Sequence, residues 1–281
     1  MTATLGIDLA SRAKKTAVCE VNWVDGHALP APPRSGVDDD ELLELMDRAD
    51  WVGIDAPFGW PDAMVEAIHG FANGRPWPTD GVPERLRYRT TDWHVHDLIA
   101  QERDTSVWPL SVAADKIAVC AWRCANLLSR HAERTGRPID RIGVPAGAPP
   151  APSDAGLVAP HGIVEVYPAG ALALWALPYR RYKTTPSIPA AAARAARGEI
   201  IGLLRRDAGS WLVVSEAVEH ACLENDDHLD ALLCALVAYA AATGRTLPPE
   251  GHRRKTAQRE GWIHLPSPDT ILNLGEPTSA T

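Results

Sequence analysis

The sequence predicts an α/β fold built on one mixed β-sheet. Two short apolar runs, residues 5–10 and 51–57, each carry a single carboxylate near their end. A helical pattern lies between them, so the two strands can run parallel in one sheet. A third acidic stretch, residues 226–230, opens a long apolar helix. We therefore expect a sheet covered by helices, with its acids gathered at one place.

Five strands are expected, in a chain order of three strands, a helix, a fourth strand, an insertion and a fifth strand. The second strand is rich in β-formers, and the short polar link before it suits a hairpin. The third contains prolines, which place it at an edge of the sheet. The expected strands are residues 4–9, 16–23, 27–31, 51–56 and 162–168.

Helices are expected where apolar residues recur at three- and four-residue spacing. The first follows the acidic run 38–40, whose negative charge favours a helix N-terminus. The last long helix can be capped by Asn225 or Asp226, and Gly244 ends it. The expected helices are residues 38–48, 62–71, 111–135, 169–177, 189–206 and 226–242.

Length and local composition predict how the chain divides. A chain of 281 residues suits one large domain with an insertion. We expect a single domain over residues 1–270, followed by a flexible tail, residues 271–281. Residues 57–160 are rich in proline and poor in strand signals, which indicates an insertion over the acid-bearing end of the sheet. Its last part, residues 144–161, is expected to be an irregular loop.

Composition limits the possible function classes. The formal net charge of −8 argues against a protein that coats nucleic acid non-specifically. The five cysteines show no paired framework, which is typical of a reducing cytoplasm. No apolar run is long enough to span a bilayer, and the N-terminus lacks the features of a signal peptide. We therefore expect a soluble cytoplasmic protein.

Four acids form the candidate site. Asp8 and Asp55 end two strands that are expected to be parallel neighbours, and such strands lie ~4.8 Å apart. The crevice of an open α/β sheet lies beyond these strand ends. Asp227 and Asp230 are three residues apart, so they share one face of the last helix near its positive end. Each acid by itself could be a turn former or a solvated helix terminus, but the combination favours a shared site.

The acid set predicts a metal and a reaction. Four carboxylates in one crevice repel each other unless hard cations lie between them. Ligands that are all oxygen favour magnesium or manganese over zinc. Two such ions ~4 Å apart would activate a water and stabilise the leaving oxygen during phosphodiester cleavage. The sequence therefore predicts a nuclease that depends on Mg²⁺ or Mn²⁺ and acts on DNA or RNA.

Two further acids are candidates with alternatives that the residues leave open. Glu165 lies within an apolar strand, so it either faces the crevice as a ligand or pairs with an arginine. Asp226 is turned away from Asp227 and is more typical of a helix cap. His228 is more typical of a surface residue than of a metal ligand.

Five motifs together resemble the domain-of-unknown-function-429 family. They read GIDLA, VGIDAPFGWP, VEVYPA, DDHLDALLCALVA and GWIHLP, and they span residues 5–266. That family is described as predicted nucleases with an RNase H-like fold. The resemblance implies a mixed five-stranded sheet in the order 3-2-1-4-5, flanked by helices.

The resemblance also assigns residues. In the wider superfamily, acids stand on strand one, strand four and the last helix, and the last-helix acids of Holliday-junction resolvases have similar spacing. Carried over residue by residue, the catalytic and metal-binding acids are Asp8, Asp55, Asp227 and Asp230. Arg89 and Asp92, in the stretch RTTD, resemble a further motif of the family.

Two other function classes compete with the nuclease. Phosphotransferases and ATPases of the actin and sugar-kinase kind also begin with Gly-Ile-Asp. They need a glycine-rich phosphate turn, whereas Asp55 is followed by Ala-Pro-Phe-Gly, which offers few backbone N–H groups. The other alternative is a non-catalytic binding module of the same fold, and the complete acid set argues against it.

Basic side chains are candidates for phosphate contact, and aromatic side chains for base stacking. The basic candidates are Arg85, Arg87, Arg180, Arg181, Lys183, Arg253, Arg254 and Lys255. The aromatic candidates are Tyr88, Tyr179, Tyr182 and Trp262. For any one of these residues by itself, a place in a solvated loop is the favoured interpretation.

Overall fold

A mixed seven-stranded sheet forms the centre of the computed structural model, which describes residues 1–79, 82–143 and 161–276. The strands are β1 (Thr2–Asp8), β2 (Ala17–Val24), β3 (His27–Pro30), β4 (Arg34–Ser35), β5 (Trp51–Asp55), β6 (Gly162–Val166) and β7 (Ile263–His264). They lie in the order β3-β2-β1-β5-β6-β7, and β4 pairs with β2. The pairs made by β2 are antiparallel, whereas β1, β5, β6 and β7 run parallel to one another.

The sheet differs from the expected five-stranded one by two additional strands. The expected strands correspond to β1, β2, β3, β5 and β6. The strand order differs because β7 extends the parallel edge beyond β6 and β4 joins beside β2. Both additional strands have two residues, which is too short for an alternating pattern to appear in the sequence.

The expected helices are present, and the described part of the chain has five more that were not expected. The helices are α1 (Asp39–Arg48), α2 (Asp62–Ala72), α3 (Val82–Arg87), α4 (Thr90–Arg103), α5 (Asp115–Thr135), α6 (Pro168–Leu174), α7 (Ala190–Asp207), α8 (Glu216–Glu224), α9 (Asp226–Ala242), α10 (Arg253–Glu260) and α11 (Thr270–Asn273). The sequence did not predict α3, α4, α8, α10 or α11. In α10 the buried positions are Ala257 and Glu260, so this helix shows almost no apolar periodicity.

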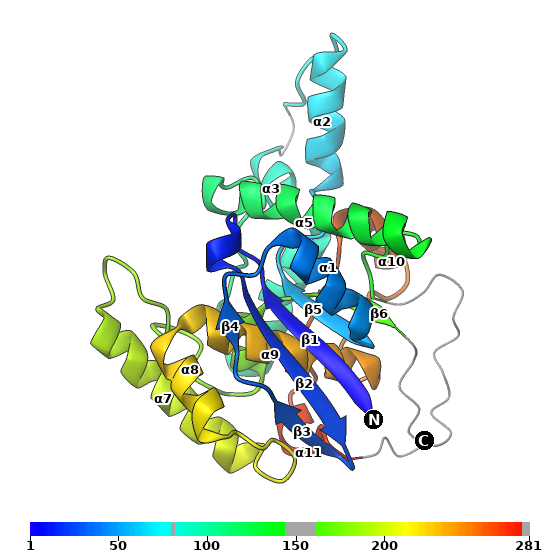
Figure 1. The fold of residues 1–281 in the computed structure, drawn as a ribbon. Coiled ribbons are helices and arrows are strands. Elements are labelled where there is room, and N and C mark those ends of the chain that lie inside the picture. The colour runs from blue at the N-terminus through cyan, green and yellow to red at the C-terminus, as the bar shows by residue number, and fades with distance from the viewer. Residues whose placement is uncertain (80–81, 144–160, 277–281) are drawn as a thin grey trace.

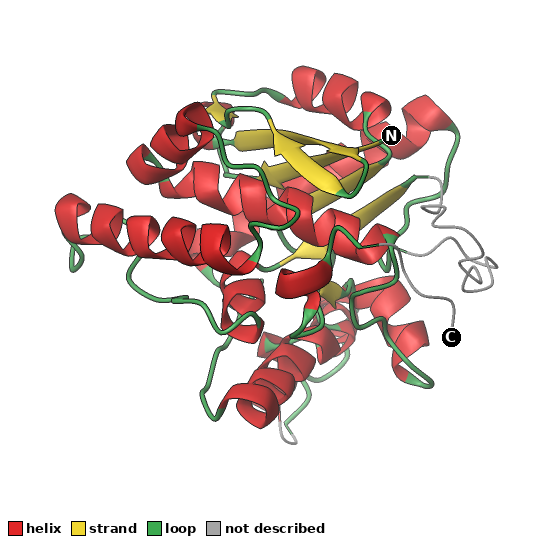
Figure 2. Cartoon of the chain, turned by 90° about the horizontal axis from the view of Figure 1, so that it is seen from below, coloured by secondary structure: helices red, strands yellow, loops and turns green. Residues whose placement is uncertain are grey.

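Helices cover both faces of the sheet (Figures 1 and 2). On one face, α1 and α5 pack against side chains of β1 and β5 such as Ile7 and Ile54. On the other face lies α9, with α6, α7 and α8 around it, and its leucines complete the larger core. Because side chains alternate along a strand, Asp8 and Asp55 point to the face opposite Ile7 and Ile54, which is the face of α9.

Two glycines allow α9 to lie very close to the sheet. A Cβ atom on Gly6 of β1 would lie 1.8 Å from the carbonyl oxygen of Ala231. A Cβ atom on Gly53 of β5 would lie 2.3 Å from the carbonyl oxygen of Cys234. Side chains at either position would therefore push α9 away from the two strands that carry the acids.

The region between β5 and β6 is helical where it is described. In Figure 1, α2 projects from the body beyond α3 and α5. Two contacts hold α5 at the end of β1: the Cys120 thiol donates to the carbonyl oxygen of Leu9 at 2.6 Å, and Arg123 Nη1 donates to that of Ala10 at 2.7 Å. The irregular loop predicted for residues 144–161 falls almost entirely outside the described residues.

The C-terminal segment departs from the expected flexible tail. Residues 270–273 form α11, and Ile271 and Leu274 are buried in the larger core. The Trp211 indole N–H also donates to the carbonyl oxygen of Ile271 at 2.8 Å. The segment up to Leu274 therefore packs into the core, and residues 277–281 lie outside the described part.

Two expectations about cysteines and membranes can be compared with the structure. All five cysteines are buried and free, as expected of core residues. Within the described part of the chain, no helix is long and apolar enough to cross a bilayer.

Because α9 lies so close to the sheet, we expect one methyl group added at Gly6 to lower the stability of the protein strongly. Gly6→Ala should reduce the free energy of unfolding by about 3 kcal/mol or more, because backbone atoms of α9 must move to make room. Urea unfolding measures the effect. Gly202→Ala in α7 is the matched control, because a Cβ atom there meets nothing within 4 Å and the change should add about 0.5–1 kcal/mol. Equal stability of Gly6→Ala and wild type would contradict the close packing.

Candidate metal centre

Three carboxylates converge where β1, β5 and α9 meet. Asp8 and Asp55 are the last residues of their strands and lie opposite each other in the parallel ladder. Asp230 is fully buried in the second turn of α9. One oxygen from each carboxylate lies within 4.8 Å of the others. We refer to Asp8, Asp55 and Asp230 as the acid triad.

The rotation of α9 about its own axis turns Asp230 toward the ends of β1 and β5. Its neighbour Ala231 lies against Gly6, and Cys234, one turn later, lies against Gly53. Asp230 therefore sits on the side of α9 that faces the sheet, one turn nearer the helix N-terminus than Cys234. The glycines thus bring the carboxylate of α9 to the two strand acids.

Two residues outside the regular elements bind Asp230. The Tyr182 hydroxyl donates a hydrogen bond to Oδ1 at 2.9 Å, and the Lys183 ammonium lies 2.5 Å from Oδ2. The sequence had marked Lys183 only as a phosphate contact. No spacing rule links it to the triad, because it comes from the irregular segment between α6 and α7.

Burial and mutual repulsion shift the titration of the triad. Burial raises the pKa of Asp8 and of Asp230, and that of Asp55 to about 7. The Lys183 ammonium opposes this rise at all three. The charges of Asp230 and Asp227 add to it at Asp8 and Asp55, and that of Asp226 adds to it at Asp230. Burial lowers the pKa of Lys183, but Asp230 and the nearby groups outweigh it, so the pKa lies well above its usual value.

The donor set of the triad fits a hard divalent cation. Three carboxylates supply oxygen ligands only, at mutual distances that one ion can bridge. Burial is the main cause of their raised pKa values, and a bound cation would act in the opposite direction. The expected preference for magnesium or manganese therefore agrees with the ligand chemistry.

The fourth predicted acid lies at the rim. Asp227 is half-buried and does not belong to the group of converging oxygens, although its charge acts on Asp8 and Asp55. Burial raises the pKa of Asp227, and the charge of Asp226 adds to the rise. The sequence placed all four acids in one cluster; the structure brings three together and leaves Asp227 beside them.

The helix cap is Asn225 and not Asp226. The Asn225 side-chain oxygen accepts a hydrogen bond from the backbone N–H of Asp227 at 3.0 Å. Asp226 is the first residue of α9, where it accepts a hydrogen bond from the Thr184 N–H and lies 3.6 Å from Arg197 Nη1. The preference for Asp226 as the cap was therefore wrong. His228 bonds to the Ser35 hydroxyl, away from the triad.

Glu165 pairs with an arginine, which decides between its two alternatives. Its oxygens receive hydrogen bonds from Arg89 Nη2 at 2.7 Å and Nη1 at 2.9 Å. The Phe58 N–H donates to the same carboxylate at 3.0 Å. Glu165 lies opposite Ile54 in the sheet, and so its side chain points to the face away from α9.

Arg89 and Asp92 belong to the same buried network. Arg89 is 2 % exposed, and its guanidinium also bonds to Asp92 at 2.9 Å. The Asp92 carboxylate accepts the backbone N–H of Arg89 at 2.8 Å, which closes the start of α4. We call Arg89, Asp92 and Glu165 the arginine network. It fixes α4 to β6, so these three secondary candidates are engaged with one another and not with the triad.

The other basic and aromatic candidates are spread over several surfaces. Arg85 and Arg87 lie on α3, Arg180 and Arg181 precede Lys183, and Arg253, Arg254 and Lys255 form the start of α10. Tyr182 and Trp262 are buried, so the prediction that they stack on bases was wrong. Tyr88 and Tyr179 are half-buried.

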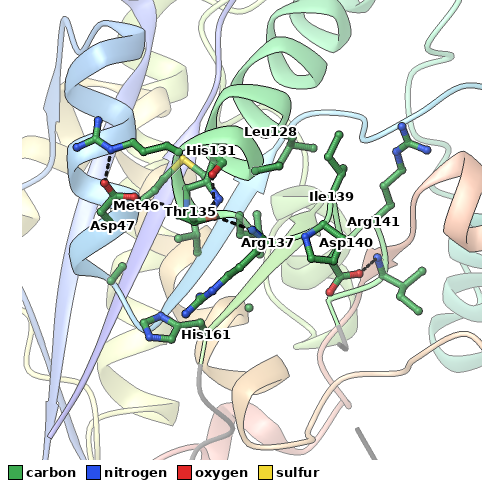
Figure 3. A pocket seen from close by; sticks show the side chains of 18 of the residues that line it. Met46, Asp47, Leu128, His131, Thr135, Arg137, Ile139, Asp140, Arg141 and His161 are labelled. Atoms are coloured by element: carbon green, nitrogen blue, oxygen red, sulfur yellow. Dashed lines mark hydrogen bonds and ion pairs between the residues drawn. The ribbon is translucent and has the colours of Figure 1, made fainter. Parts of the chain in front are cut away.

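A cavity of about 1030 Å³ lies at the other end of the sheet (Figure 3). Residues at the starts of β5 and β6 line it, together with the ends of α1 and α5. Figure 3 shows Asp47 paired with a basic side chain and Arg137 extending toward His161. None of the triad residues is among the described residues that line this cavity.

The chain matches, over residues 6–254, the model of a family described as "Protein of unknown function (DUF429)". It belongs to the DUF429 family. No curated protein and no solved structure matches the chain. The match to DUF429 includes the triad, Lys183 and the arginine network.

The raised pKa values predict how stability depends on pH without metal. Asp55 holds its proton in the folded state up to a pKa of about 7, but loses it near 4 when unfolded. Its contribution to stability is therefore present in acid and is lost as the pH rises from about 4 to about 7. With a chelator present, the melting temperature of wild type should fall relative to that of Asp55→Asn over this range. Parallel melting curves of the two proteins would contradict the shift.

Proposed function

We propose that this DUF429 protein is a metal-dependent nuclease with an RNase H-like fold. The observation that carries the proposal is the convergence of Asp8, Asp55 and Asp230 from two strand ends and a helix. The mixed sheet supports the fold assignment, because antiparallel strands β1 to β3 are followed by parallel strands and acids end β1 and β5. The phosphodiester bond is the proposed target, in DNA or RNA.

The triad would hold magnesium or manganese, and Asp227 at the rim is the carboxylate that a second ion would use. When bound, such ions supply Lewis-acid activation of water and neutralise charge on the phosphate. The family resemblance and the donor set both favour this chemistry. The proposal therefore places all four predicted acids in the reaction, with the triad in the leading role.

The chain's own residues orient the triad and balance its charge. The Tyr182 hydroxyl fixes one oxygen of Asp230, and the Lys183 ammonium lies at the other. The Lys183 side chain as a whole is 44 % exposed, but its ammonium lies against the buried Asp230. Asp230 is buried, and Asp8 and Asp55 are half-buried, so water screens these interactions less than at the surface.

Loss of one triad carboxylate should abolish cleavage. In Asp230→Asn, the rate should fall by at least ~100-fold, because the side chain keeps its shape but loses the charge that holds metal. The assay uses labelled single-stranded, duplex, hybrid and branched substrates with magnesium, manganese or chelator. Metal should also raise the melting temperature of wild type and not that of Asp230→Asn.

Glu44→Gln is the matched control, because Glu44 is an exposed acid of α1 far from the triad in the fold. It should cleave and bind metal like wild type. Wild-type cleavage and an unchanged metal-induced shift in Asp230→Asn would remove the triad from the reaction and refute the proposal.

Lys183 should compete with metal for Asp230. Without metal, Lys183→Met should lower the melting temperature, because the buried carboxylates lose the cation beside them. With magnesium or manganese, the rise in melting temperature should be larger than in wild type, because the ion no longer displaces an ammonium. Arg181→Met, an exposed change in the same segment, should show the wild-type rise. An equal or smaller rise in Lys183→Met would contradict the competition.

A further inference from the structure

An aromatic cluster around α4 has no part in the chemistry proposed above. Trp93 of α4 packs edge-on against Trp108 and Tyr88, with ring centroids 4.9 and 6.1 Å away. Trp108 in turn lies 4.7 Å from Tyr88 and stacks on His96 at 4.0 Å. Tyr88, Trp93, His96 and Trp108 are called the aromatic cluster below.

One ring of the cluster is open to solvent. Trp93 is 39 % exposed, whereas Tyr88, His96 and Trp108 are half-buried. Two of the half-buried rings, those of Tyr88 and Trp108, pack against Trp93. A large aromatic ring that is held in place and left exposed is suited to recognising a flat apolar ligand.

Tyr167 connects the cluster to the acid centre. It follows β6 directly, so it lies at the sheet edge where the acids of β1 and β5 lie. Burial raises the pKa of Tyr167, and the charge of Asp55 raises it further. The Tyr167 hydroxyl donates to the carbonyl oxygen of Trp108 at 3.4 Å.

The segment that carries Lys183 makes a second connection. Tyr179 shares a hydrogen bond of 2.6 Å with the hydroxyl of Thr105. Arg180 Nη2 donates to the carbonyl oxygen of Ser106 at 3.0 Å. The loop that leads to Trp108 is therefore tied to the same segment whose next residues bind Asp230.

The arginine network fixes the position of the cluster. Arg89 stands between Tyr88 and α4, and its guanidinium is bound to Glu165 of β6 by two hydrogen bonds. Tyr88 and Trp93, on either side of this anchor, are therefore held at a constant position relative to the end of β6. The RTTD stretch thus has a positioning role toward this surface.

Positive charge accompanies the rings. The Arg87 guanidinium lies 5.0 Å from the ring centroid of Tyr88, and that of Arg180 lies 5.0 Å from the ring of Tyr179. Both arginines are exposed, and neither forms an ion pair with any carboxylate in the described part of the chain. They can therefore contact phosphates next to a stacked base.

We propose that the aromatic cluster binds unpaired bases of a single-stranded nucleic acid and presents the adjoining backbone to the acid centre. This inference rests on the proposed nuclease function and adds the substrate class. Stacking requires a free base face, which a single strand offers and a duplex hides. The surface therefore favours strands with unpaired bases, without a preference for sequence.

The experiment measures binding of labelled oligonucleotides by fluorescence anisotropy in chelator, so that no cleavage occurs. The probes are a deoxyribo- and a ribo-oligonucleotide, a duplex of equal length, and a strand with the same phosphates but without bases. Trp93→Ala should bind the single strands about 5- to 100-fold more weakly than wild type, and Trp93→Phe should bind nearly as tightly. Trp122→Ala, in which a ring of α5 that is 59 % exposed is removed, should bind like wild type.

The strand without bases should bind weakly and equally to wild type and Trp93→Ala. Unchanged binding of the single strands by Trp93→Ala, or equal wild-type affinity for the duplex, would overturn the inference. The inference would also be overturned if Trp93→Phe bound the single strands as weakly as Trp93→Ala, because an aromatic ring at this position would then make no difference to binding. The two oligonucleotide types show whether DNA or RNA is preferred.

Cleavage assays separate this inference from the proposed function. Asp230→Asn should bind the single strands like wild type and fail to cleave them. Binding that depends on Trp93, in a wild-type protein that cleaves nothing with either metal, would support the stacking surface and refute the nuclease. Cleavage that is lost in Asp230→Asn but unchanged in Trp93→Ala would support the nuclease function and overturn the stacking surface.

Discussion

The close contact between α9 and the sheet is the constraint on which the candidate site depends. Gly6 and Gly53 stand two residues before Asp8 and Asp55, on the face that α9 covers. The same absence of side chains that lets the helix approach also sets the separation of its Asp230 from the strand acids. The larger core and the acid triad are therefore two results of one packing arrangement.

Two groups of buried acids lie on opposite faces of the sheet, and each has its own cation. Arg89 is 2 % exposed and is held by both Asp92 and Glu165, so its charge is permanent and enclosed. Lys183 is 44 % exposed and contacts only Asp230 among the described carboxylates. The first arrangement suits a fixed structural junction, because removal of the enclosed guanidinium would leave the buried carboxylates without a partner. The second leaves the carboxylates open to exchange with a dissolved cation.

The sequence predicted those parts of the site that regular elements position. The apolar runs and their order placed Asp8 and Asp55 at neighbouring strand ends, and helical spacing placed Asp230 beside them. The contact of Lys183 with Asp230 could not be predicted, because Lys183 lies in an irregular segment and no periodicity relates that segment to the triad. Asp227 shares the helix face of Asp230, but one turn of rise places it at the rim.

The other differences between the predicted and the observed structure have similar physical causes. Glu165 could have been assigned to the opposite face from its alternation with Val164 and Val166, both of which join the core under α9. The helix α4 begins on a buried ion pair and not on an apolar stripe, so periodicity does not reveal it. Two-residue strands such as β7 form through tertiary pairing that a local pattern does not encode.

A thiol near the triad has a consequence for the oxidation chemistry of the protein. Cys120 contacts the residue after Asp8, and burial, with the charges of Asp55 and Asp8, raises its pKa to about 12. At neutral pH the sulfur therefore carries its proton and is a poor nucleophile toward peroxides. It is equally a poor ligand for soft metals, since these bind thiolates. Burial and the nearby acids thus keep this thiol in its protonated, unreactive form.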